Sequence, residues 1–143
     1  MNVKQILRLK GSAAVETVHP QTTVAEAAGR LSQKRIGALV VLQSDGAIAG
    51  ILSERDLVRG IGEAGAAALD RPVAALMTAR VECCVPTDTG VSVLERMTAG
   101  RFRHMPVVDH GRMVGLLSIG DVVKARIGEI EHENHQMANM LHG

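Results

Sequence analysis

The feature that most constrains the fold of this chain is an internal duplication. Residues 50–58 read GILSERDLV, and residues 115–123 read GLLSIGDVV. Upstream of these, IGALVV at 36–41 corresponds to RHMPVV at 103–108. Self-similarity at a fixed distance indicates that each copy is one structural unit.

The distance between the copies changes slightly along the repeat. It falls from 67 residues at Val24 and Val91 to 65 residues at Ser53 and Ser118. Loops tolerate changes of one residue far better than helices or strands do. We therefore expect one length change at the end of the first helix and another in a hairpin turn.

Each copy predicts the same elements, in the order strand, helix, strand, strand, helix. An initial extended segment is expected over 15–18 and again over 81–85. Apolar residues then recur at the spacing of one helical face, at Val24, Ala27, Ala28 and Leu31 and at Val91, Val93, Leu94 and Met97. Two strands follow across a Gly-containing turn, over 38–42 and 48–52, and over 105–108 and 113–117. The fold class is therefore α+β, with each half too small to be stable alone.

A Ser-x-x-Asp motif begins the second helix of both copies. Ser53 with Asp56, and Ser118 with Asp121, have the spacing of a capping box, in which hydroxyl and acid stabilise the start of a helix. The same residues suit a ligand site, because the carboxylate can accept hydrogen bonds from a ribose diol and helix N-terminal amides favour an anion. Duplication copies a cap as readily as a site, so the residues alone leave both interpretations open.

The composition argues against several classes of function. Lys and Arg number 16 against 15 Asp and Glu, which gives no basic surface for nucleic acid. Phe102 is the one aromatic residue, which excludes a base-stacking platform. The apolar runs are too short to span a bilayer, and residues 1–10 lack the apolar core of a signal peptide. We expect a cytoplasmic protein with no membrane or nucleic-acid partner.

Three weaker signals are assigned no site. Gly60, Gly62 and Gly65 match G-x-G-x-x-G, but a helix rather than a strand precedes them, so we expect a flexible connector. Cys83 and Cys84 are adjacent, and a disulfide between them would strain the peptide. The histidines near the C-terminus lack a third metal ligand. A redox or metal-responsive sensor is therefore the least favoured function.

The C-terminal residues carry a heptad pattern. Apolar residues and one Asn are spaced 4, 3, 4, 3 and 4 positions apart, at Val123, Ile127, Ile130, Asn134, Met137 and Leu141. A polar residue in such a seam can fix the register of a two-stranded coiled coil. An amphipathic helix packed on its own sheet would show the same pattern. The first interpretation predicts a homodimer.

The strings at 50–58 and 103–124 closely resemble the motifs of a tandem cystathionine-β-synthase (CBS) domain pair. The resemblance runs from about Val3 to about Ile127, and Met77-Thr78 resembles the opening of a second CBS repeat. It implies two β-α-β-β-α repeats packed with pseudo-twofold symmetry, plus a C-terminal helix. We therefore divide the chain into a first repeat with its N-terminal segment and linker (1–66), a second repeat (67–127) and a helical tail (128–143).

The resemblance also implies where ligands bind. Each of two clefts joins the Ser-x-x-Asp of one repeat to the second strand of the other, and backbone groups of that strand read the adenine edge. One expected cleft comprises Gly37, Ala38, Ser118 and Asp121. The other comprises Ser53, Asp56, Arg103, His104, Met105 and Pro106, and its greater positive charge favours a phosphorylated ligand. Further phosphate contacts are expected from Lys34, Arg35 and Arg55.

The function that the resemblance implies is that of a stand-alone regulatory module, not an enzyme. An adenosine derivative (AMP, ADP, ATP, NAD(H) or S-adenosylmethionine) would bind in the clefts and signal to a separate, unidentified protein. No catalytic residue, catalytic cofactor or metal site is assigned. The alternative is a structural, dimerising protein with vestigial clefts. We expect Asp56→Ala and Asp121→Ala each to weaken binding in one cleft at unchanged stability.

Overall fold

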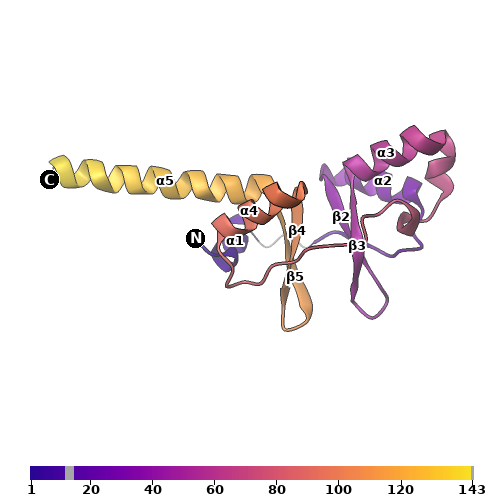
Figure 1. The fold of residues 1–143 in the computed structure, drawn as a ribbon, viewed down its shortest axis with the longest axis horizontal. Coiled ribbons are helices and arrows are strands. Elements are labelled where there is room, and N and C mark those ends of the chain that lie inside the picture. Colours follow the sequence, from indigo (N-terminus) through magenta and orange to yellow (C-terminus); the bar gives the residue numbers. More distant parts are fainter. Residues whose placement is uncertain (12–14, 143) are drawn as a thin grey trace. The chain divides into compact units, whose positions relative to one another are not determined.

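The computed structural model describes residues 1–11 and 15–142, which form two compact units (Figure 1). The first-repeat unit comprises Ala14–Glu82. The second-repeat unit comprises Cys83–Gly143 together with the N-terminal segment Met1–Ala13. The sequence boundaries grouped that N-terminal segment with the first repeat. The compact units instead follow packing, because the helix in this segment is buried against the second repeat.

The first-repeat unit is a three-stranded sheet covered by helices. β1 (Thr17–Val18) pairs in parallel with β2 (Ala38–Leu42), and β2 pairs antiparallel with β3 (Ile48–Ser53). α2 (Val24–Lys34) connects the first two strands, and α3 (Glu54–Ala64) follows β3. The buried core contains Val18, Val24, Ala27, Leu31, Leu39, Val41, Leu52, Val73 and Leu76. The expected order of elements is confirmed in this unit.

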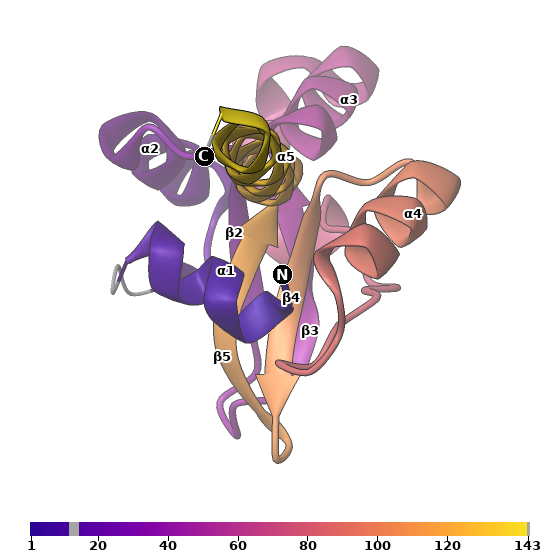
Figure 2. The same ribbon diagram turned by 90° about the vertical axis from the view of Figure 1, so that its left-hand side faces the viewer.

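The second-repeat unit is built on an antiparallel hairpin of β4 (His104–Asp109) and β5 (Arg112–Ser118). α4 (Gly90–Gly100) precedes the hairpin, and α5 (Ile119–His142) follows it. Figure 2 looks along α5 and shows α4 on one side of it and the N-terminal helix on the other. The expected helical tail is the distal part of α5, and its last residue, Gly143, lies outside the described residues.

The strand expected over 81–85 does not form. Cys84 alone makes a parallel bridge to Val107. Its N–H donates to Pro106 O (3.0 Å), and its carbonyl accepts from Val108 N (2.8 Å). One residue of the segment therefore does the pairing that two residues of β1 do in the first repeat.

The helix caps correct the alignment of the two copies. Thr23 and Thr89 each accept, through the side-chain oxygen, a hydrogen bond from the N–H three residues later. Both helices end in an arginine with left-handed backbone, Arg35 (φ 53°) and Arg101 (φ 57°). The offset is therefore constant along this helix, and the length change expected at its end is wrong. Val91, expected on the buried face, is exposed.

An N-terminal helix, α1 (Val3–Lys10), was not expected from the sequence. Asn2 and Gln5 form a capping box at its start. Val3 and Ile6 are buried in the core of the second-repeat unit. A Cβ on Gly90 would lie 3.0 Å from Ile6 Cδ1, so a side chain on α4 at this position would crowd α1. Gly90 is equivalent to the buried Val24 of the first repeat. A glycine at this position leaves the space that Ile6 of α1 occupies.

Two equivalent glycines allow other segments to approach the second strand of each hairpin. A Cβ on Gly50 would lie 2.6 Å from the carbonyl oxygen of Thr78. A Cβ on Gly115 would lie 2.7 Å from Leu7 Cδ2 of α1. Either distance is too short for a side chain. The linker therefore packs on β3 in one unit, and α1 packs on β5 in the other.

The segment expected to be a flexible connector is helical. Gly60 and Gly62 belong to α3, and Gly65 begins a 3-10 helix that ends at Asp70. A second 3-10 turn, Val73–Ala75, follows. A Cβ on Gly60 would lie 2.4 Å from Leu76 Cδ2, which shows how closely α3 and the linker pack. Of the three glycines, Gly60 is required by this packing, and Gly65 has the positive φ (66°) that ends α3.

Candidate functional site

The Ser53-x-x-Asp56 motif lies where β3 ends and α3 begins. Ser53 N donates to Asp56 Oδ2 (2.8 Å), and Asp56 N donates to Ser53 Oγ (3.3 Å). Ser53 Oγ also donates to Asp56 Oδ2 (3.1 Å). The capping box expected from the sequence is therefore present.

The Asp56 carboxylate is saturated by its own chain. Its second oxygen, Oδ1, accepts from Arg59 Nη2 (2.7 Å) and from Thr78 Oγ1 (3.1 Å). The side chain is only 4% exposed. A buried carboxylate in such a network supports the fold, so the expectation that Asp56→Ala leaves stability unchanged is not supported. A ligand diol would have to displace one of these donors.

The Ser118-x-x-Asp121 motif has the same cap at the junction of β5 and α5. Ser118 N donates to Asp121 Oδ2 (2.8 Å), and Asp121 N donates to Ser118 Oγ (3.1 Å). Lys10 Nζ, at the end of α1, lies 2.9 Å from the same Oδ2 and donates to Leu116 O (2.7 Å). The Asp121 side chain is 24% exposed. Among residues 1–11 and 15–142, the side-chain contacts of Asp121 involve Oδ2 and leave Oδ1 for a ligand.

The charge of Asp121 is stabilised by its partners. Partial burial opposes ionisation, but the Ser118 N–H and the Lys10 ammonium more than offset it and hold the pKa of Asp121 below its usual value. The carboxylate is therefore ionised at neutral pH. An ionised carboxylate accepts hydrogen bonds from hydroxyl groups more strongly than a neutral acceptor does.

In the first-repeat unit, the acid lies beside the second strand of its own repeat. Ala38 pairs with Ser53 across the hairpin. Gly37 O accepts a hydrogen bond from Glu54 N (3.0 Å). The structure thus brings Gly37 and Ala38 together with Ser53 and Asp56.

The second-repeat unit repeats this geometry. His104 pairs with Ser118, and Arg103 O accepts from Ile119 N (2.8 Å). Met105 lies in the hydrophobic core, and the carbonyl of Pro106 accepts from Cys84 N, so both have structural roles. The expected joining of each strand to the acid of the other repeat concerns two separate units and stays a prediction.

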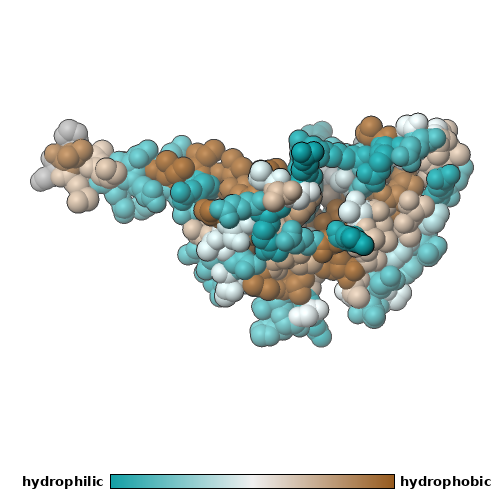
Figure 3. Space-filling model, viewed as in Figure 1, coloured by the Kyte–Doolittle hydropathy of each residue, from teal (hydrophilic) through white to brown (hydrophobic). Residues whose placement is uncertain are grey.

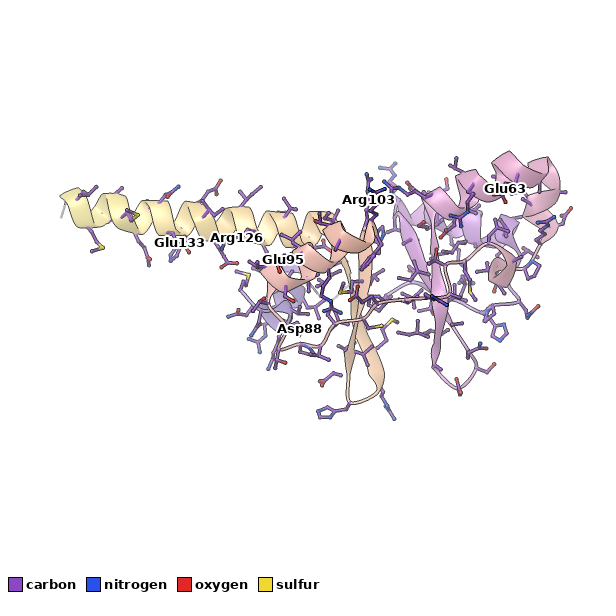
Figure 4. All side chains as sticks on the ribbon, viewed as in Figure 1. Glu63, Asp88, Glu95, Arg103, Arg126 and Glu133 are labelled. Atoms are coloured by element: carbon purple, nitrogen blue, oxygen red, sulfur yellow. The ribbon has the colours of Figure 1, made fainter. Side chains whose placement is uncertain are left out.

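The basic residues proposed for phosphate contact are exposed. Lys34 lies 3.7 Å from Glu16 Oε1, and Arg35 and Arg55 are exposed. Figure 4 shows Arg103 extending from the start of β4. The left-handed backbone of Arg35, shared by its counterpart Arg101, is unusual for a residue other than Gly. In both repeats this conformation ends the helix, because the N–H of the arginine bonds back to the last helical turn.

Three contacts of the acids were not expected from the sequence. Arg59 could have been found, because it lies one helical turn after Asp56. Thr78 was noted only as part of the second-repeat opening. Nothing in the sequence indicated that Lys10 would reach Asp121, since this contact depends on how α1 packs.

Burial makes the Cys84 thiol unreactive as a nucleophile or metal ligand. Burial, followed by the charge of Asp88, raises the pKa of the Cys84 thiol to about 11. A thiol with this pKa is almost wholly protonated at neutral pH.

The described residues contain neither a candidate metal site nor a membrane-spanning helix. Within residues 1–11 and 15–142, no group of three or more His, Cys, Asp or Glu side chains could hold a metal ion. None of the helices described is both long and apolar enough to cross a membrane.

Comparison with known proteins supplies a family for this architecture. Residues 3–63 and 73–128 match the family model named CBS domain. A CBS-domain containing protein of known structure from Agrobacterium tumefaciens is 46% identical, with a TM-score of 0.83 over 87% of this chain and 92% of that one. The mitochondrial CBS domain-containing protein CBSX3 of Arabidopsis thaliana is 30% identical over 99% of this chain and 72% of its own length.

Some of the similar structures contain bound ligands. A CBS domain protein from Pyrobaculum aerophilum, complexed with AMP, is 26% identical, with a TM-score of 0.75 over 85% of this chain and 89% of that one. This chain spans about a quarter of the length of several larger curated relatives from Arabidopsis thaliana.

Proposed function

Because this chain belongs to the CBS domain family, we propose that it is a regulatory module that binds an adenosine derivative at the Ser118–Asp121 end of β5. The observation that carries the proposal is the Asp121 carboxylate, which is ionised and partly exposed and has Oδ1 still available. A ribose offers two neighbouring hydroxyl donors to such an acceptor. The AMP complex of the Pyrobaculum aerophilum relative supports this class of ligand.

The surroundings of Asp121 suit a phosphorylated ligand. The N-terminus of α5, where backbone amides point outward, begins at Ile119 and favours an anion. Arg103 and Arg101 are exposed at the start of β4 in the same unit, and a guanidinium binds phosphate through two parallel hydrogen bonds. AMP, ADP, ATP and NAD(H) carry phosphate, whereas S-adenosylmethionine does not. The basic residues therefore favour a nucleotide.

Regulation requires that the ligand distinguish two arrangements of the protein. A ligand shifts an equilibrium only by the difference between its affinities for the two states. The group that differs between the two states would be Lys10, whose flexible side chain can stay on Asp121 Oδ2 or rotate away when the ribose binds the same carboxylate. We propose that the signal passes to a separate protein and that the module is cytoplasmic and carries out no catalysis itself.

The test is binding of AMP, ADP, ATP, NAD(H) and S-adenosylmethionine, measured by calorimetry on the full chain. Asp121→Asn removes the charged acceptor and should weaken the best ligand about 10-fold to 100-fold, the usual range for a hydrogen bond to a charged group. Asp109→Asn, at the exposed end of the same hairpin, is the matched control and should not change affinity. Equal affinities for all three proteins would refute the assignment of Asp121.

The ultraviolet spectrum of the purified protein provides an independent check. The chain has no Trp and no Tyr, so an absorption band near 260 nm would come from a co-purified adenine compound, which mass spectrometry could identify.

A structural, dimerising protein is the second candidate. The saturation of Asp56 by Arg59 and Thr78 favours it for the first repeat. A melting temperature unchanged by the whole ligand panel would support this alternative, because a ligand that binds only the native state must raise that temperature.

A further inference from the structure

α5 has two apolar faces, and its own unit covers only one of them. Val122 and Ala125 are buried in the core of the second-repeat unit, and Glu129 accepts a hydrogen bond from the N-terminal amine of Met1 (2.9 Å). Residues 131–141 are all exposed. The contacts of α5 with its own unit therefore lie in its first three turns, and the helix continues beyond them.

The second apolar face follows the heptad pattern. Its residues, here called the α5 seam, are Val123, Ile127, Ile130, Asn134, Met137 and Leu141. The five apolar members are between 40% and 80% exposed. At 100° per residue the seam lies more than a quarter turn from the buried face. Figure 3 shows hydrophobic residues along α5 where it extends beyond the rest of its unit.

We propose that the α5 seam pairs with the seam of a second copy of this chain in a parallel two-stranded coiled coil. In heptad notation Ile127, Asn134 and Leu141 take the a positions, and Val123, Ile130 and Met137 take the d positions. This goes beyond the proposed ligand function and does not depend on it.

Asn134 determines the orientation. In a parallel pair, a positions face each other, so Asn134 meets Asn134 of the partner subunit and the two amides can hydrogen-bond. In an antiparallel pair centred on the seam, Asn134 would face an apolar d residue, Ile130. A buried amide without a hydrogen-bonding partner is unfavourable, which favours the parallel arrangement.

Charges beside the seam agree with the same arrangement. Arg126 takes a g position and Glu131 the following e position, and these positions come together across a parallel coiled coil. Two symmetric Arg126–Glu131 pairs form if each Arg126 turns from Glu129 of its own helix, which lies 3.8 Å away, toward the partner. Figure 4 shows Arg126 and Glu133, one heptad apart, on α5.

The same charges disfavour a membrane as the occupant of the seam. Between Ile130 and Leu141 the sequence contains Glu131 and Glu133 and no Lys or Arg. Helices that lie on membrane surfaces are typically rich in Lys and Arg on the polar face. In addition, a helical segment of this length is marginal in water on its own, so pairing would stabilise it.

The experiment is analytical ultracentrifugation of the full chain over a range of concentrations. Wild type should show a reversible dimer. Ile130→Asp places a charge in the seam and should raise the dimer dissociation constant at least 100-fold, with loss of helical circular dichroism. His132→Asp, at an f position on the outer face, is the matched control and should leave the dissociation constant unchanged. Asn134→Leu should lower it at least 10-fold.

A charge exchange tests the orientation. Arg126→Glu should weaken the dimer, and adding Glu131→Arg should restore it, because the g–e′ pair is then re-formed with opposite signs. A wild-type monomer at all concentrations, with or without affinity for anionic vesicles, would overturn the proposal. A dimer unaffected by Ile130→Asp would also overturn it, because the copies would then associate through another surface.

Discussion

The Ser-x-x-Asp sites of the two repeats share one backbone but are closed by unrelated parts of the chain. In the first-repeat unit, the Thr78 N–H donates to Ile51 O (2.8 Å). In the second-repeat unit, the Lys10 ammonium donates to the equivalent carbonyl, Leu116 O (2.7 Å). A lysine side chain from α1 thus takes the place of a backbone amide of the linker.

The same exchange occurs at the carboxylates. Thr78 Oγ1 donates to Asp56 Oδ1 (3.1 Å), and Lys10 Nζ lies 2.9 Å from Asp121 Oδ2. The Thr78 N–H can leave Ile51 O only if the linker backbone moves, whereas Lys10 can leave both of its acceptors by rotating about its side-chain bonds. Two copies of one motif have thus become a closed, structural version and an open one.

The largest difference between the two sites should appear in the free energy of unfolding when each acid is replaced by alanine. We expect Asp56→Ala to lower the free energy of unfolding by about 3 kcal/mol, because donors around a buried position lose their acceptor. Asp121→Ala should lower it by about 1 kcal/mol, through loss of the helix cap and a partly exposed ion pair. Urea unfolding followed by circular dichroism suits a chain without Trp or Tyr. Equal losses would show that the two sites are equally closed.

Alanine at the two equivalent glycines should give a smaller difference. In Gly50→Ala the new methyl group meets the carbonyl oxygen of Thr78, which moves only with its backbone. In Gly115→Ala it meets the end of the Leu7 side chain, which can rotate away. We expect losses of about 2–3 kcal/mol and about 1 kcal/mol respectively. A larger loss for Gly115→Ala would mean that α1 is held more rigidly than the linker.

The smallest effect should be a pH dependence at the open site. The folded pKa of Asp121 lies below its usual value of 3.8. The stability from this shift is therefore present above pH 3.8 and is lost as the pH falls toward the folded pKa. The melting temperature of wild type should exceed that of Lys10→Met at pH 7, and the difference should shrink below about pH 4. A difference that stays constant with pH would show that the Lys10–Asp121 pair adds no stability.

The repeated elements and both caps could be predicted because they depend on local patterns. Ser and Asp three residues apart at a strand end, and apolar residues at helical spacing, carry their structural meaning in adjacent positions. The same holds for the turn between β4 and β5. Local patterns therefore located both carboxylates correctly.

What could not be predicted depends on contacts between distant positions. α1 is a short helix with two buried residues, Val3 and Ile6, too few to form a recognisable helical pattern in the sequence. The replacement of Thr78 by Lys10 results from the packing of α1 on β5. The misalignment at Val91 arose because Gly90 was not expected to be a buried position.

The attachment of α1 to the second repeat has a consequence for synthesis. Leu7 contacts the position of Gly115, and at about 5–20 residues per second the ribosome needs roughly 5–20 s to make the chain between them. During that time the first repeat is synthesised, while α1 presents an apolar face without its partner strand. A nascent-chain chaperone would therefore meet this helix before the second repeat exists.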